Sequence, residues 1–166
     1  MNANADSKQP QKWRFLAALV LALFIASCAN QSQTRIGLFS ATSSVIGVVN
    51  DTLFIGEATG YLDRTGIINL ESASAPIVNC SGNFRYIRSR EGVANVSCDD
   101  GSSAEFEFVG LSALSGYGKG TTSLGIATFT FGLSVDEAKP YLVVPMGQTL
   151  VEVDGKPAIM ALPSEE

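Results

Sequence analysis

The sequence predicts an all-β domain over residues 35–166: a small antiparallel β-barrel, roll or sandwich built from repeated hairpins. Between Arg35 and Phe131, short runs of β-branched and aromatic residues are separated by Gly, Asp-Gly and Ser-Gly, which is typical of strands joined by tight turns. The same region lacks the 3.6-residue apolar period of an amphipathic helix. Roughly six to nine strands of this kind favour a closed or two-layered β architecture.

The composition narrows the classes of function. Of the 166 residues, 46% are hydrophobic and 16% are charged, which fits one folded domain and argues against a disordered chain. The net charge of −5 argues against a nucleic-acid partner, because such binders neutralise phosphates with cations. The absence of histidine removes the usual general base and the commonest zinc ligand. We therefore expect no catalytic residues, no metal and no cofactor, and we predict that the protein is not an enzyme.

A basic segment followed by an apolar one stands at the N-terminus. Lys8, Lys12 and Arg14 precede an uninterrupted run of 12 apolar residues, Phe15–Ala26. A helix of this length spans about 18 Å, whereas crossing the hydrocarbon core of a bilayer needs roughly 20 residues. The order of basic, apolar and small residues is typical of a signal peptide, which we assign to residues 1–27.

The end of this segment, Ile25-Ala26-Ser27-Cys28, resembles the lipobox of bacterial lipoproteins. The resemblance implies that the signal peptidase cleaves before Cys28, which then carries diacylglycerol on its sulfur and usually a third acyl chain on its amine. Two or three acyl chains make membrane attachment effectively permanent. Ala29, rather than Asp, follows the cysteine, which implies the outer membrane if the host is Gram-negative. An ordinary secretory signal with an incidental cysteine and a short uncleaved anchor remain the alternatives.

The segment after the cysteine is short and polar. Residues 28–34 comprise the lipidated cysteine and a tether of six residues, Ala29–Thr34. A flexible tether of this length reaches about 13 Å, so the folded body is expected close to the lipid. Without residues 1–27 the chain has 8 Lys and Arg against 15 Asp and Glu, so the exported part is acidic.

A weak internal repeat predicts three hairpins. An aromatic residue, a polar loop, a glycine and a strand recur in residues 61–70, 86–96 and 117–129. The glycines of the repeat, Gly66, Gly92 and Gly125, are expected to adopt a positive φ where the chain leaves each turn, because glycine does so without steric cost.

The two remaining cysteines predict a strand register. Exported chains are oxidised, and an even pair, Cys80 and Cys98, is left after Cys28 is lipidated. If the two lie opposite each other in one hairpin, Phe84 pairs with Ala94 and the loop is centred on Ser89. Such a hairpin has one apolar and one polar face, as a half-buried pair of strands requires. The inward face would comprise Val78, Cys80, Gly82, Phe84, Tyr86, Ala94, Val96 and Cys98.

The rest of the chain continues the pattern. Asp99-Asp100-Gly101 predicts a turn, and the alternation in 104–108 and 127–131 points Ala104, Phe106, Phe108, Ala127, Phe129 and Phe131 inward. Ser134 and Glu137 have the spacing of a capping box, so one helical turn is expected near 134–139, stopped by Pro140. A final hairpin, 150–162, turns at Asp154-Gly155, and Pro157 indicates an edge strand.

One cationic cluster is a candidate binding site. Arg85, Arg88 and Arg90 lie close to one predicted hairpin tip in an otherwise acidic domain. Guanidinium groups bind phosphate and carboxylate in a bidentate manner, so the cluster is a candidate for lipopolysaccharide phosphate, anionic lipid headgroups or an acidic protein. Lys119 joins them only if the fold brings it near. The alternative role is to keep a loop tip soluble.

Other candidate sites have simpler explanations. Residues 115–122 are rich in glycine and contain Lys119, but Gly120 follows the lysine and a strand follows the loop, unlike a phosphate-binding loop. Asp99, Asp100, Glu105 and Glu107 fit a turn and a solvated strand face better than a calcium site or a glycosidase pair. Ser115-Gly116-Tyr117 resembles, weakly, the Ser-Gly-x-x-Tyr motif of the membrane-bound lysozyme inhibitors, although its tyrosine follows the glycine directly.

These observations predict a membrane-anchored bacterial lipoprotein that acts as a non-enzymatic binding or structural module of the cell envelope. Its partners would be the membrane, through Cys28, and an envelope protein or lipopolysaccharide. An inhibitor or assembly accessory, which needs an exposed apolar patch or a compact arginine cluster, and a carboxylate-dependent envelope hydrolase are the alternatives.

Overall fold

The computed structural model describes residues 35–122 and 125–162. The predicted signal peptide, the lipobox with Cys28, and the tether lie outside these residues. None of the helices in the described part has the length and apolar character needed to cross a membrane.

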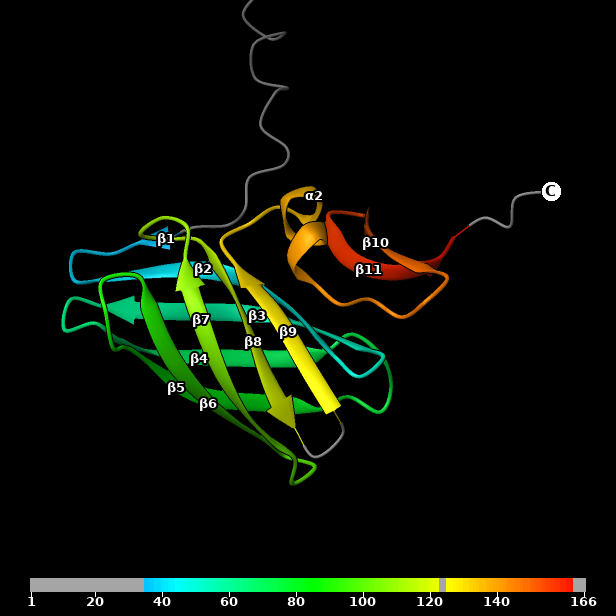
Figure 1. Cartoon of the computed structure of the whole chain (residues 1–166), viewed down its shortest axis with the longest axis horizontal. Coiled ribbons are helices and arrows are strands. Elements are labelled where there is room, and N and C mark those ends of the chain that lie inside the picture. Colours follow the sequence, from blue (N-terminus) through cyan, green and yellow to red (C-terminus); the bar gives the residue numbers. More distant parts are fainter. Residues whose placement is uncertain (1–34, 123–124, 163–166) are drawn as a thin grey trace, which may run out of the picture. The chain divides into compact units, whose positions relative to one another are not determined.

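The main body is an eight-stranded antiparallel barrel in which each strand pairs with the next one in sequence (Figure 1). Pairing of the first barrel strand, β2, with the last, β9, closes the ring. A two-residue strand, β1 (Arg35–Ile36), pairs with the beginning of β2. The barrel strands are β2 (Ser40–Val49), β3 (Thr52–Tyr61), β4 (Thr65–Ser72), β5 (Asn79–Tyr86), β6 (Glu91–Cys98), β7 (Ser103–Gly110), β8 (Gly116–Thr122) and β9 (Gly125–Phe131). The predicted all-β class is confirmed, and of the three architectures expected the chain adopts the barrel.

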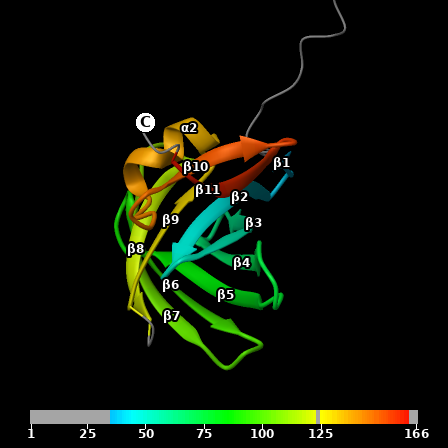
Figure 2. The ribbon, with the colours of Figure 1, turned by 90° about the vertical axis from the view of Figure 1, so that its right-hand side faces the viewer.

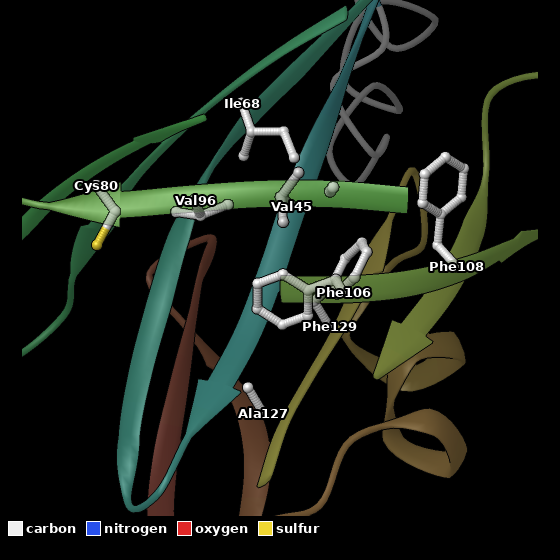
Figure 3. Close-up of a cluster of buried hydrophobic side chains, with 9 residues drawn as sticks. Val45, Ile68, Cys80, Val96, Phe106, Phe108, Ala127 and Phe129 are labelled. Carbon is white, nitrogen blue, oxygen red and sulfur yellow. The ribbon is translucent and has the colours of Figure 1, made fainter. Parts of the chain in front are cut away.

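The predicted register of the cysteine hairpin is confirmed. Cys80 pairs with Cys98 and Phe84 with Ala94 in the β5–β6 ladder, and the two cysteines form a disulfide. All residues assigned to the inward face belong to or pack on the barrel core, apart from Gly82, which has no side chain. Figure 3 shows that side chains such as Ile68, Val45 and Phe129 converge from different strands. The period of two along each strand therefore places one apolar face inside the ring.

Inward phenylalanine rings lie over glycines on the neighbouring strand. A Cβ on Gly66 would come within 2.2 Å of Phe84, and a Cβ on Gly92 within 2.1 Å of Phe108. Each of these rings belongs to the residue that pairs directly with the glycine. The expected positive φ at the repeat glycines is therefore right for Gly125, whose φ is 133°, and wrong for the other two. Gly66 and Gly92 are small because a ring occupies the space above them.

Gly66 and Gly60 provide a matched test of this packing, since they pair with each other and both lie near Phe84. Gly66→Ala is expected to lower the free energy of unfolding by about 2 kcal/mol, because the new methyl group overlaps both the Phe84 ring and the carbonyl oxygen of Thr59. Gly60→Ala should change it by less than about 0.5 kcal/mol, since its Cβ would lie 3.5 Å from the ring. Urea unfolding measures the free energy of unfolding of the two variants. Equal losses in the two variants would contradict the packing role, and Phe84→Leu should restore part of the stability of Gly66→Ala.

A second apolar core lies outside the barrel wall. The helix α2 (Val135–Ala138), the 3-10 turn η1 (Lys139–Tyr141) and the hairpin β10 (Gln148–Val153)–β11 (Lys156–Ala161) follow β9. This hairpin lies over the outer face of β2 (Figure 2). Buried side chains of the segment, including Leu150, pack on residues of β2 and β3. The outer face of these strands is therefore apolar as well.

The local signals in this segment are confirmed with one correction. Ser134 and Glu137 form the predicted capping box, and the hairpin turns at Asp154-Gly155, both with a positive φ. Pro140 does not stop the helical turn, because the chain continues as η1 to Tyr141 with the proline in its first turn. Proline lacks only the amide hydrogen that the first turn of a helix leaves unused.

Candidate functional site

The barrel has two ends of different character. Because the strands alternate in direction, residues 37–39, 62–64, 87–90 and 111–115 lie at one end, here the open end. Residues 50–51, 73–78 and 99–102 lie at the opposite, far end. The two ends expose different side chains, and the candidate site is at the open end.

A pocket of about 350 Å³, here the mouth, lies at the open end. Its floor includes Phe84, Tyr86 and Phe131, and its walls include Leu62 and Leu114. Most of the lining is apolar or aromatic, which is the usual character of a pocket that takes an apolar group.

Behind the floor, the barrel interior holds a smaller void of about 60 Å³. Phe84, Tyr86 and Phe131 line both spaces, so the rings separate the mouth from the void. Tyr86 and Phe108 meet edge to face, with ring centroids 5.0 Å apart. A void of this size with apolar walls offers water no partners.

The rim of the mouth exposes large apolar side chains. Leu38 is 87% exposed, Phe39 67% and Leu62 76%. Tyr61, Ile87 and Leu111 are also exposed at this end. Isolated exposed apolar residues are ordinary, but a group of them around one pocket marks an interaction site.

Arginines join the loops of the open end. Arg64 donates to the carbonyl of Arg88, and Arg90 donates to the carbonyl of Leu111. The Arg88 guanidinium forms an exposed ion pair with Glu91 at 2.6 Å. Two members of the predicted cluster, Arg88 and Arg90, are therefore at the open end, where they are exposed and also bond to protein groups.

The structure adds one arginine to the cluster and removes another from it. Arg64 was not singled out in the sequence. The alternating direction of strands in a meander, which brings the 62–64 and 87–90 turns to the same end, is the signal that could have identified it. Its guanidinium also lies 5.8 Å from the centre of the Tyr86 ring. Arg85 instead lies on the outer wall, where it lines a shallow groove together with Lys119.

Charge differs between the two ends. The far end carries Asp51, Asp99 and Asp100, all exposed. Hydrogen bonds from the Ser102 hydroxyl and amide lower the pKa of Asp100, and the corresponding bonds from Thr65 lower the pKa of Asp63 at the open end. The Asp63 and Asp100 carboxylates therefore stay ionised near neutral pH. With Arg64, Arg88 and Arg90 against Asp63 on its turns, the open end still has an excess of positive charge.

Tyr86, in the lining of the mouth, also has a shifted pKa. Burial raises the pKa of its phenol, because the phenolate loses solvation, and the nearby Arg64 partly opposes this effect. The phenol is therefore neutral near pH 7.

The other carboxylates weighed as a candidate site lie away from the mouth, and two of them, Glu105 and Glu107, line the shallow groove on the outer wall together with Arg85 and Lys119. Glu105 and Glu107 are exposed on β7, and Asp99 accepts hydrogen bonds from Asn79. Within residues 35–122 and 125–162, no group of three or more metal-binding side chains is close enough to hold an ion. Residues 116–122 form strand β8, and Tyr117 stacks on Tyr141 with ring centroids 4.4 Å apart.

No family model, curated protein or solved structure matches this chain.

Proposed function

We propose that the chain is a lipid-anchored, non-enzymatic binding module of the bacterial cell envelope, which holds an apolar group of an envelope component at the mouth. The lipobox supports the anchor at Cys28, and Ala29 favours the outer membrane in a Gram-negative host. The observation that carries the binding role is the mouth of about 350 Å³ with an aromatic floor and an exposed apolar rim.

The chemistry of the site supports binding over catalysis. The sequence has no histidine. Of the four carboxylates considered for hydrolysis, Asp99 and Asp100 lie on a turn at the far end, and Glu105 and Glu107 line the shallow groove on the outer wall, so none of the four lines the mouth. A hydrolase that uses two carboxylates needs them to converge across a substrate. The mouth instead presents phenyl rings and aliphatic side chains.

The same rim favours one second candidate, an inhibitor or assembly accessory that docks on an envelope protein. Exposed leucine and phenylalanine side chains beside arginines are a composition found where proteins meet. The two candidates differ in what the mouth contacts, so a contact experiment distinguishes them.

The anchor is tested by Cys28→Ser. We expect this variant to lose incorporation of a palmitate analogue and to leave the membrane fraction, because no acyl chain remains to hold it. Met146→Ser is a suitable control, since it changes a fully exposed side chain outside the lipobox and outside the lining of the mouth. A Cys28→Ser protein that still labels and still sediments with membranes would contradict the anchor.

The mouth is tested by photocrosslinking in intact cells. A photoreactive phenylalanine at Leu62 lies at the rim, and one at Ile77, also exposed, lies at the far end. We expect Leu62 to capture one discrete envelope component and Ile77 to capture none. Capture of a lipid supports the first candidate and capture of a protein the second, whereas equal capture at both positions would contradict a binding site at the mouth.

A further inference from the structure

We propose that the open end docks on the anionic surface of the bilayer in which the protein is anchored, with its apolar rim in the headgroup region and its arginines among the phosphates. This inference rests on the proposed anchor at Cys28. It adds an orientation: the mouth faces the lipid and the acidic far end points away.

The rim supplies the apolar contact. Leu38, Phe39 and Leu62 are all more than 60% exposed, and they lie on two turns that line one mouth. Ile87 extends the group to a third turn. Side chains of this size gain free energy when they move from water into the interface of a bilayer, in proportion to the apolar area they bury.

Charge complementarity favours a bilayer with anionic lipid. Arg64, Arg88 and Arg90 are all exposed on turns of the open end, against one acidic residue there, Asp63. The described turns of the far end carry aspartates and no Lys or Arg. Cationic groups near an anionic surface are attracted to it, and guanidinium binds lipid phosphate with two parallel hydrogen bonds. The bonds that Arg64 and Arg90 make to loop carbonyls use only part of the five donors of each guanidinium.

The predicted tether gives the same orientation. Six residues separate Cys28 from Arg35, and a flexible segment of this length reaches about 13 Å. Arg35 pairs with Thr42, near the start of β2 at the open end. The far end of β2, at Val49, lies about 23 Å farther along the strand at the usual rise per residue. The lipid therefore reaches the open end more easily than the far end.

Tryptophan fluorescence provides the test. The single tryptophan, Trp13, lies in the predicted signal peptide, so the mature lipidated protein has none and an introduced tryptophan reports one position. The probes are Leu62→Trp at the rim, Ile77→Trp at the far end and Met146→Trp in the C-terminal segment, at positions that are 76%, 53% and 101% exposed. Each protein is reconstituted in vesicles of phosphatidylglycerol and phosphatidylcholine with brominated acyl chains.

We expect Leu62→Trp to be strongly quenched, with emission shifted to the blue, and the other two to resemble a tryptophan in water. Flotation of the vesicles reports the anchor separately. Protein that floats while Leu62→Trp is no more quenched than Ile77→Trp would overturn the docking and leave the anchor intact. Protein that does not float with the vesicles would contradict the lipid anchor at Cys28, and the docking, which depends on that anchor, would be contradicted as well.

The role of charge is tested in the same system. Arg88→Gln is the preferred variant, since within the described residues the ion-pair partner of the Arg88 side chain is Glu91, an exposed side chain. On anionic vesicles we expect the docking equilibrium of Leu62→Trp to fall about fivefold in this background. It should fall further on pure phosphatidylcholine and in about 0.5 M salt. Quenching that is unchanged on uncharged vesicles would overturn the choice of an anionic surface.

Discussion

Replacing Phe129 by alanine is expected to lower the free energy of unfolding by about 3–5 kcal/mol. Phe129 is 8% exposed, and its ring lies 5.0 Å from that of Phe106. Its ring also covers Gly118, where a Cβ would come within 2.4 Å. The side chain already lines the interior void, so its removal enlarges a space that the closed ring of strands cannot collapse to fill. The expected loss of stability is therefore the sum of two terms: the free energy gained by moving the phenyl ring from water into the core, and the cost of the cavity that its removal leaves.

Phe39→Ala is the matched control for this prediction. Phe39 is 67% exposed at the rim, so its removal should change the free energy of unfolding by less than about 0.5 kcal/mol. Guanidinium unfolding of the two variants measures the difference. Similar losses would mean that the interior does not carry the stability of the barrel. The docking proposed above predicts a different effect for Phe39→Ala, which is weaker contact of the protein with anionic vesicles.

Removal of the disulfide is the second large effect. The double variant Cys80→Ala, Cys98→Ala is expected to lose about 3 kcal/mol, because a loop with a sequence separation of 18 no longer restricts the unfolded chain. The disulfide also lies in the barrel core, where Cys80 is 6% exposed. Two small side chains replace the sulfur atoms there, so a packing loss adds to the entropic effect.

Serines at the next paired position provide the control. Ser81 pairs with Ser97 on the outer face of the same two strands, where both are exposed. Their double replacement by alanine should change stability by less than about 0.5 kcal/mol. Unfolding with and without dithiothreitol checks the assignment, because reduction of the unchanged protein should reproduce most of the loss. A reduced protein as stable as the oxidised one would contradict the prediction.

The candidate site was predicted only in part. Arg88 and Arg90 were identified from their spacing, and the structure places both at the open end. Arg64 and the rim residues Leu38 and Leu62 were not identified, because Arg64 is a single cation in its turn, and Leu38 and Leu62 adjoin Phe39 and Tyr61 as ordinary apolar pairs. They form a group only when the turns of successive hairpins meet at one end of the ring. Cys28 lies outside the described residues, so its lipidation stays a prediction.

The sequence by itself determined the features that depend on neighbours along the chain. The period of two, the Asp100-Gly101 and Asp154-Gly155 turns and the capping box at Ser134 follow from the chemistry of a few adjacent residues. The register of the cysteine hairpin belongs here too, because a disulfide and a short loop fix how two consecutive strands pair.

Only the tertiary structure decided what depends on distant residues. Val45 meets Phe131 across the closure of the ring, and no local pattern predicts whether a sheet closes or folds into two layers. The same closure decided that Gly66 and Gly92 lie beneath rings, that the outer face of β2 is covered by the C-terminal hairpin, and that arginines and apolar residues share one end. Period and turn chemistry act over a few residues, whereas closure is a balance of packing over the whole ring.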